Sequence, residues 1–131
     1  MKHLLPILTL ALATSACSTP EPSGIRSPEL FRQVAIRHSL ASNQPAAAVA
    51  LCFEAEATLL PMSDIVRDEK SGRATYRLRG FGFTFEEIDF EPTPNGSRMT
   101  VFIAPNMNAK WHLDFERDRG IPLGACAGSM N

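Results

Sequence analysis

The sequence predicts an α+β domain in which one helix packs on a curved antiparallel β-meander of about five strands, with an additional strand near the N-terminus. Two observations lead to this fold class. Apolar residues alternate with polar ones across residues 64–116, and short turn motifs interrupt the alternation at regular intervals. An alanine-rich amphipathic segment precedes this stretch. A sheet with one apolar face must bury it, and that segment is long enough to be the cover.

Four turns divide residues 64–116 into strands, and in each hairpin the register set by the turn agrees with the apolar alternation. The turns fall at 69–72, 80–81, 95–96 and 105–109. The predicted cross-strand pairs are Ile65 with Tyr76, Leu78 with Phe83, Tyr76 with Phe85, Phe90 with Val101, Ile88 with Ile103, Ile103 with Trp111, and Val101 with Leu113.

The predicted meander has one irregularity and one strongly apolar face. The alternation changes parity across Glu86 and Glu87, so we expect a β-bulge between Phe85 and Ile88. The apolar face consists of aromatic and aliphatic side chains from all the later strands: Tyr76, Leu78, Phe83, Phe85, Ile88, Phe90, Val101, Ile103, Trp111, Leu113 and Phe115.

Residues 45–60 are predicted to form the covering helix. Asn43 or Gln44 stands near the cap position, Pro45 suits the first turn, and the following alanines have high helix propensity. Pro61 ends the segment. The expected buried face is Ala46, Val49, Ala50, Phe53, Ala57 and Leu60. A strand over residues 49–55 is the alternative.

Residues 29–42 fit two patterns. Ser27 and Pro28 are a good start for a helix that would place Leu30, Phe31, Val34 and His38 on one face. The alternation from Val34 to Leu40 instead has the period of a strand. We favour a strand over residues 33–40, in which His38 lies among apolar neighbours as a hydrogen-bonded structural histidine.

The N-terminus has the features of an export signal. Lys2 and His3 precede an apolar run over residues 4–13, which is half the length that a membrane-spanning helix needs. The run closes on Thr14, Ser15, Ala16 and Cys17, which resembles the lipobox of bacterial lipoprotein signal peptides, although Thr14 stands where that family usually has Leu. The resemblance is confined to this segment and leaves the mature domain without a recognised family.

The resemblance to lipoproteins implies that residues 1–16 are removed and that Cys17 carries the lipid. It also implies an outer-membrane location, because Ser18 follows the cysteine in place of the Asp associated with inner-membrane retention. Cleavage after Ala13 or Ala16 without lipidation is the alternative, and it would leave a secreted or soluble periplasmic protein. Residues 17–28, rich in Pro, Ser and Gly, are then the lipidated Cys and a flexible tether.

Cysteine counting links the lipid to the fold. The chain has three cysteines, an odd number for an exported protein. A lipid on Cys17 leaves Cys52 and Cys126 to pair in an oxidising compartment, which would stabilise the domain by roughly 4 kcal/mol on the chain-entropy model. Two buried reduced thiols are the alternative.

Composition narrows the functional classes. Residues 29–131 fit a single small globular domain, and a net charge of −1 gives no electrostatic basis for binding nucleic acid. The sequence contains no Cys-x-x-Cys, no His-x-x-x-His, no phosphate-binding loop and no nucleophile elbow, so we expect no metal, no cofactor and no enzymatic activity. The oligomeric state is left open.

The predicted registers place Asp89, Phe102 and His112 in one row on the outer face of the sheet. Asp89 and His112 would be separated by a whole strand, about 9 to 10 Å, which is too far for an acid and base that act together. The row is instead a candidate binding patch with Phe102 as its anchor. Cover of Phe102 by the tail after Gly120 or by residues 34–40 is the alternative.

These observations favour a lipid-anchored module that faces the periplasm and binds an envelope protein or polymer through the outer face or an edge strand. One alternative is an inhibitor of a periplasmic hydrolase, in which the loop at residues 105–108 would enter the partner's cleft. A small enzyme that uses the outer sheet face is a further alternative.

Overall fold

The computed structural model describes residues 23–128. The predicted signal peptide, Cys17 and the first part of the predicted tether lie outside the described residues. Where the tether enters the described part, it is attached to the domain: Ile25 forms a β-bridge with Thr84, and Gly24 exchanges hydrogen bonds with Asn106. The tether predicted over residues 17–28 is therefore attached to the domain from Gly24 onward, and its last residue, Pro28, begins the first helix.

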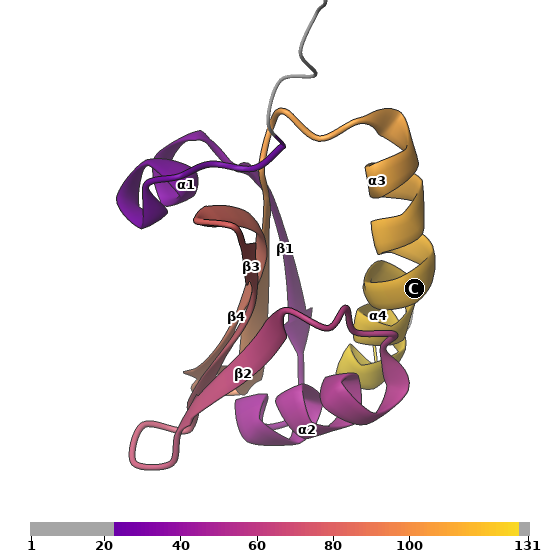
Figure 1. The fold of residues 1–131 in the computed structure, drawn as a ribbon. Coiled ribbons are helices and arrows are strands. Elements are labelled where there is room, and N and C mark those ends of the chain that lie inside the picture. Colours follow the sequence, from indigo (N-terminus) through magenta and orange to yellow (C-terminus); the bar gives the residue numbers. More distant parts are fainter. Residues whose placement is uncertain (1–22, 129–131) are drawn as a thin grey trace, which may run out of the picture.

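An open five-stranded antiparallel sheet in the order β1-β5-β4-β3-β2 forms the centre of the domain (Figure 1). The predicted α+β fold is confirmed. Strands β2 to β5 form the meander, and β1 joins it beside β5. The strand bounds are β1 Ile36–Ser42, β2 Ser63–Asp68, β3 Arg73–Gly80, β4 Phe83–Thr93 and β5 Gly96–Ile103.

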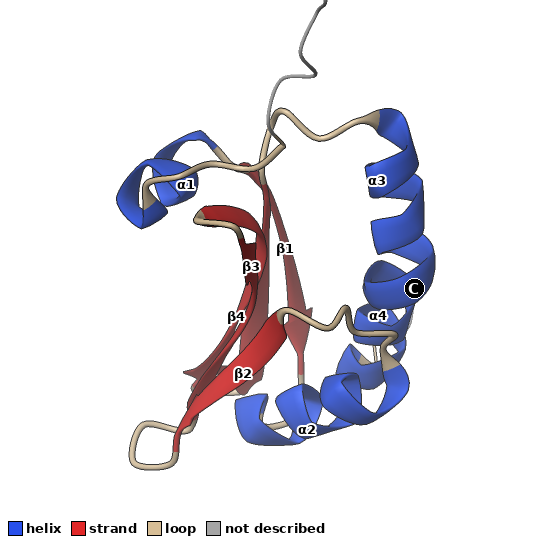
Figure 2. Cartoon of the chain, viewed as in Figure 1, coloured by secondary structure: helices blue, strands red, loops and turns tan. Residues whose placement is uncertain are grey.

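Helices lie on both faces of the sheet (Figure 2). The short helix α1, Pro28–Val34, packs on the outer face. Helix α2, Ala46–Glu56, and a continuous helical rod cover the inner face. The rod consists of α3, Ala109–Phe115, the π-helical segment η1, Glu116–Gly120, and α4, Ile121–Ala127.

Both patterns in residues 27–42 are realised, one after the other. The Ser27 hydroxyl accepts a hydrogen bond from the Leu30 N–H at 3.2 Å and so caps α1, as the helical interpretation requires. The chain leaves the helix at Ala35 and enters β1. The favoured strand exists, but it starts later than predicted.

Helix α2 confirms the predicted cover. Its buried residues are Ala46, Val49, Ala50 and Phe53. The Phe53 ring packs against Tyr76 and Phe90, with centroid distances of 5.3 and 5.7 Å. Ala57 ends the helix in an extended conformation, a turn earlier than Pro61 suggested.

One predicted hairpin register is confirmed and two are shifted. Ile65 pairs with Tyr76 as predicted. At the β4–β5 turn Thr93 pairs with Gly96, so Ile88 faces Val101 and Phe90 faces Met99. This shift by two residues keeps every side chain on its predicted face, because the side-chain period of a strand is two.

The β3–β4 hairpin contains a β-bulge next to the predicted position, which was between Phe85 and Ile88. Gly80 pairs with Phe83 across the turn, and Leu78 pairs with Glu86 while Arg79 pairs with Thr84. Phe85 is therefore the extra residue of β4. The bulge directs Glu86 into the core, where it is 0% exposed.

The predicted last strand of the meander, at residues 110–116, was wrong because this segment is helix α3. The Asn108 side chain accepts a hydrogen bond from the Trp111 N–H at 2.8 Å and caps the helix. The edge of β5 that such a strand would have used is filled by β1, in which Ile36 faces Ile103. Leu113, predicted to be in the core, is 73% exposed.

The predicted irregular tail also belongs to the rod. Pro122 has no N–H to donate to the carbonyl of Asp118, so the helix cannot keep its regular bonding there. The π-helical segment η1 precedes the proline, and the Asp118 carbonyl accepts a hydrogen bond from the Thr58 N–H at 2.8 Å. Gly128 ends α4 in the left-handed conformation, at φ 62°.

A disulfide joins Cys52 of α2 to Cys126 of α4, with their Cα atoms 5.7 Å apart. This is the pair that cysteine counting selects. The bond closes the end of the rod onto the helix that covers the sheet, in line with the predicted attachment of the tail to that helix.

The helical conformation of residues 109–115 makes Trp111 and Leu113 energetically different, whereas a strand would bury both. The Trp111 ring stacks on Phe85 at 5.5 Å, so we expect Trp111→Ala to lower the free energy of unfolding by about 3 kcal/mol. Leu113→Ala should change it by less than about 0.5 kcal/mol. Denaturant unfolding of both variants measures the difference, and equal losses would contradict the helix.

Candidate functional site

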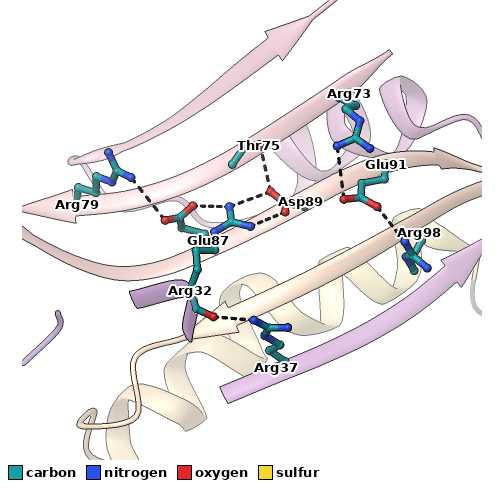
Figure 3. A network of polar contacts seen from close by, with 9 residues as sticks. All are labelled: Arg32, Arg37, Arg73, Thr75, Arg79, Glu87, Asp89, Glu91 and Arg98. Carbon is teal, nitrogen blue, oxygen red and sulfur yellow. Dashed lines mark hydrogen bonds and ion pairs between the residues drawn. The ribbon is translucent and has the colours of Figure 1, made fainter. Parts of the chain in front are cut away.

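A polar network on the outer face attaches α1 to the sheet (Figure 3). The guanidinium of Arg32 contacts both oxygens of Asp89, at 2.5 and 3.0 Å, and Glu87 at 2.6 Å. Thr75 donates a hydrogen bond to Asp89 at 3.2 Å, and Arg79 lies 3.6 Å from Glu87. The bonds to Asp89, followed by those to Glu87, raise the pKa of Arg32 against the opposing effect of its partial burial.

The predicted row of Asp89, Phe102 and His112 does not exist. Asp89 pairs with Thr100. Phe102 lies two residues further along β5, on the same face, and pairs with Glu87. His112 belongs to α3, on the other side of the sheet, because residues 110–116 do not form a strand. The structure thus brings Asp89 and Phe102 onto one face and leaves His112 out.

Phe102 is covered by its own chain, through Arg37 within the predicted residues 34–40 and also through Arg32 of α1, and not by the tail after Gly120. Only 6% of the residue is exposed. The guanidinium of Arg32 lies 4.2 Å from the centre of its ring, and that of Arg37 lies 5.3 Å away. Arg37 also donates a hydrogen bond to the Arg32 carbonyl at 2.7 Å. Phe102 therefore presents no apolar surface as the anchor of a patch.

Arg32 should be the side chain that attaches α1. Its removal leaves Glu87, whose side chain is 4% exposed, without its closest ion pair, so we expect Arg32→Ala to lower the free energy of unfolding by about 2 kcal/mol. Arg73→Ala is the matched control, because Arg73 is 61% exposed and its partner Glu91 also pairs with Arg98. The control should stay within about 0.5 kcal/mol in thermal or denaturant unfolding. Similar values for both variants would refute the assignment.

The inner face holds a buried polar cluster around Glu86. Its carboxylate accepts hydrogen bonds from the Tyr76 hydroxyl at 2.7 Å, the Trp111 indole at 3.0 Å and Arg119 at 2.8 Å. Arg119 is 2% exposed. Its terminal nitrogen contacts Oε2 of Glu86, and its Nε lies 2.5 Å from the other carboxylate oxygen, Oε1. Burial, and then the Glu86 charge, raise the pKa of Tyr76. Glu86, Tyr76 and Arg119 are each at most 2% exposed, so this cluster joins the rod to the sheet inside the core.

A groove of about 860 Å³ lies between the edge of the sheet and the rod. Its sheet side consists of β1 and β5 residues, and its other side comes from the rod. The lining residues are His38, Leu40, Val101, Ile103, His112, Phe115, Glu116, Gly120, Ile121, Leu123, Gly124 and Ala125.

Small residues of the rod and the apolar floor of the sheet create this groove. Gly120, Gly124 and Ala125 line the rod side of the groove and contribute little side-chain volume there. Val101 and Ile103 form the floor and are nearly buried. His38 lines the groove beside Leu40 and Val101, but it is exposed, so the prediction of a structural histidine was wrong. The polar groups of the groove are the two histidines and Glu116.

Strand β1 is the outer wall of the groove and one edge of the sheet. It pairs with β5 along its whole length, from Ile36 opposite Ile103 to Ser42 opposite Ser97. An edge strand offers backbone N–H and C=O groups to a further strand. A chain segment added to β1 could therefore place alternate side chains in the groove.

The loop at residues 105–108 is engaged with its own chain. Asn106 exchanges two hydrogen bonds with Gly24, at 3.1 and 3.0 Å, and Asn108 caps α3. Met107 is buried, at 8% exposure. This loop is therefore a structural connection, and its capping residue Asn108 marks the start of α3.

Comparison with protein-family models, curated proteins and solved structures finds no match for this chain. Within residues 23–128, no helix is long and apolar enough to cross a membrane. The same part of the chain contains no cluster of three or more His, Cys, Asp or Glu side chains that could hold a metal ion.

Proposed function

We propose that this protein is a lipid-anchored lipoprotein of the bacterial cell envelope, whose domain faces the periplasm and acts as a non-enzymatic binding module. Its groove receives an extended segment of an envelope protein. The segment adds to the edge of β1 and places apolar side chains against Val101 and Ile103.

The groove is the observation that carries this proposal. An apolar floor, walls with few polar groups and an adjacent edge strand together suit a peptide that contributes backbone hydrogen bonds and alternate apolar side chains. The outer face of the sheet suits a partner less well, because α1 and its ion pairs occupy it. The carboxylate of Glu86 is fully buried and out of reach of a substrate.

The anchoring part of the proposal rests on the resemblance of residues 1–17 to a lipoprotein signal. We expect the N-terminal peptide of the mature protein to begin at Cys17 and to carry acyl chains by mass spectrometry. Cys17→Ser should move the protein from the membrane pellet to the soluble fraction, whereas Ser18→Ala should leave it in the pellet. An unmodified terminus at Thr14 or Cys17 would refute the anchor.

Site-specific photocrosslinking in intact cells tests the binding part. A photoreactive residue at His38, exposed on β1 beside the groove, should give a discrete crosslinked protein. The same residue at Val66, 48% exposed on the opposite edge strand β2, should not give that product. We expect Ile121→Glu, which places a charge in the groove, to reduce the His38 product at least fivefold.

Leu113→Glu is the matched control for Ile121→Glu. Both residues are exposed on the rod, at 73% and 62%, but only Ile121 lines the groove. Leu113→Glu should leave the His38 product unchanged. Equal effects of the two variants, or identical products from His38 and Val66, would contradict binding in the groove.

A further inference from the structure

The turn between β3 and β4 exposes an aromatic ring at the surface. Phe81 is 88% exposed, the largest exposed fraction among the large apolar side chains of the described residues. Met62, 48% exposed, lies directly beside this turn, because a Cβ added to Gly80 would come within 2.5 Å of the Met62 sulfur. The turn and Met62 together form a small apolar protrusion, which we call the Phe81 tip.

The backbone at Phe81 adopts a conformation that a bulky residue rarely takes. Phe81 has φ 54°, and Gly82, which follows it, has φ 79°. These are the two central residues of the turn, because the flanking residues Gly80 and Phe83 pair with each other. Positive φ at both central residues is the pattern of a type I′ turn, in which Asn or Asp before Gly is preferred. A phenylalanine that is exposed and strained at once gains nothing for folding, which points to a role outside the domain.

The start of the described chain lies close to this turn. Ile25 bridges to Thr84, just after the turn, and the Arg26 guanidinium lies 4.8 Å from the centre of the Phe83 ring. From Cys17 to Ser23 the chain spans at most about 20 Å, even when fully extended. A lipid on Cys17 therefore holds this end of the domain within about 20 Å of the bilayer surface.

We propose that the Phe81 tip contacts the lipid bilayer and orients the anchored domain. Phe81 and Met62 enter the interfacial region, and the exposed Arg26 lies near anionic headgroups. Helix α2 and the β2–β3 turn then point away from the membrane, because they lie at the opposite end of the sheet (Figure 1). This inference rests on the proposed lipidation of Cys17.

Fluorescence quenching in vesicles tests the contact. The mature lipidated chain is reconstituted into vesicles of phosphatidylethanolamine and phosphatidylglycerol, with and without bromine on the acyl chains. We expect bromine to reduce the emission of Phe81→Trp at least twofold, after subtraction of the Trp111 signal measured in the unsubstituted protein. Leu51→Trp is the matched control, because Leu51 is 63% exposed on α2, and its emission should change by less than a tenth.

The outcomes separate this inference from the proposed anchor. Mass spectrometry of the same sample reports the lipid on Cys17. A lipidated protein in which Phe81→Trp is not quenched would overturn the contact and leave the anchor intact, and equal quenching of both probes would overturn the orientation. A chain without lipid would overturn both proposals.

A second variant tests the reason for the aromatic residue independently of any probe. Phe81→Asn creates the Asn-Gly sequence that a type I′ turn prefers, so the melting temperature should rise. If Phe81 were present for folding, the same substitution would lower the melting temperature. A decrease would therefore refute the argument that Phe81 is retained for a contact outside the domain.

Discussion

The buried ion pair between Glu86 and Arg119 is the interaction on which the rest of the structure depends. A carboxylate and a guanidinium that are both nearly inaccessible would each be very costly without the other. Glu86 faces the core because the bulge at Phe85 resets the parity of β4, and Arg119 meets it from the π-helical part of the rod. The pair thus requires one position of the rod against the sheet. An apolar contact would allow that position to vary.

The groove is a consequence of this position. The ion pair fixes the middle of the rod against β4, and the disulfide fixes its end to α2. The rod then passes beside β1, which α4 contacts, and Gly120 and Gly124 contribute little side-chain volume to the groove between the rod and the sheet. A binding surface at the edge of a small domain needs such fixed walls, because a flexible wall would close over its own apolar floor.

The sequence predicts the parts of the fold that local rules determine. Turn chemistry and alternation specify β2 to β5, and the alanine-rich face specifies α2. Local rules fail at residues 109–127, where Trp111, Leu113 and Phe115 alternate as in a strand while Trp111, Phe115, Arg119, Leu123 and Ala127 recur at every fourth residue. Four residues advance an α-helix by about 40° more than one turn, so such a stripe drifts around a regular helix. A wider π-helical segment reduces this drift. The segment depends on Pro122 and on the contact with Glu86, and the spacing of apolar residues reveals neither of them.

The candidate site was missed for the same reason. The groove exists only because β1 takes the place beside β5 that residues 110–116 were expected to take. Which of two segments pairs with one strand edge depends on tertiary contacts, which local sequence patterns do not reveal. The predicted patch on the outer face failed for an electrostatic reason. Glu87 and Asp89 lie side by side on a half-covered surface, so they need a cation, and α1 supplies Arg32. That guanidinium also covers Phe102. The features that made the outer face resemble a binding site are therefore the ones that bind the protein's own first helix.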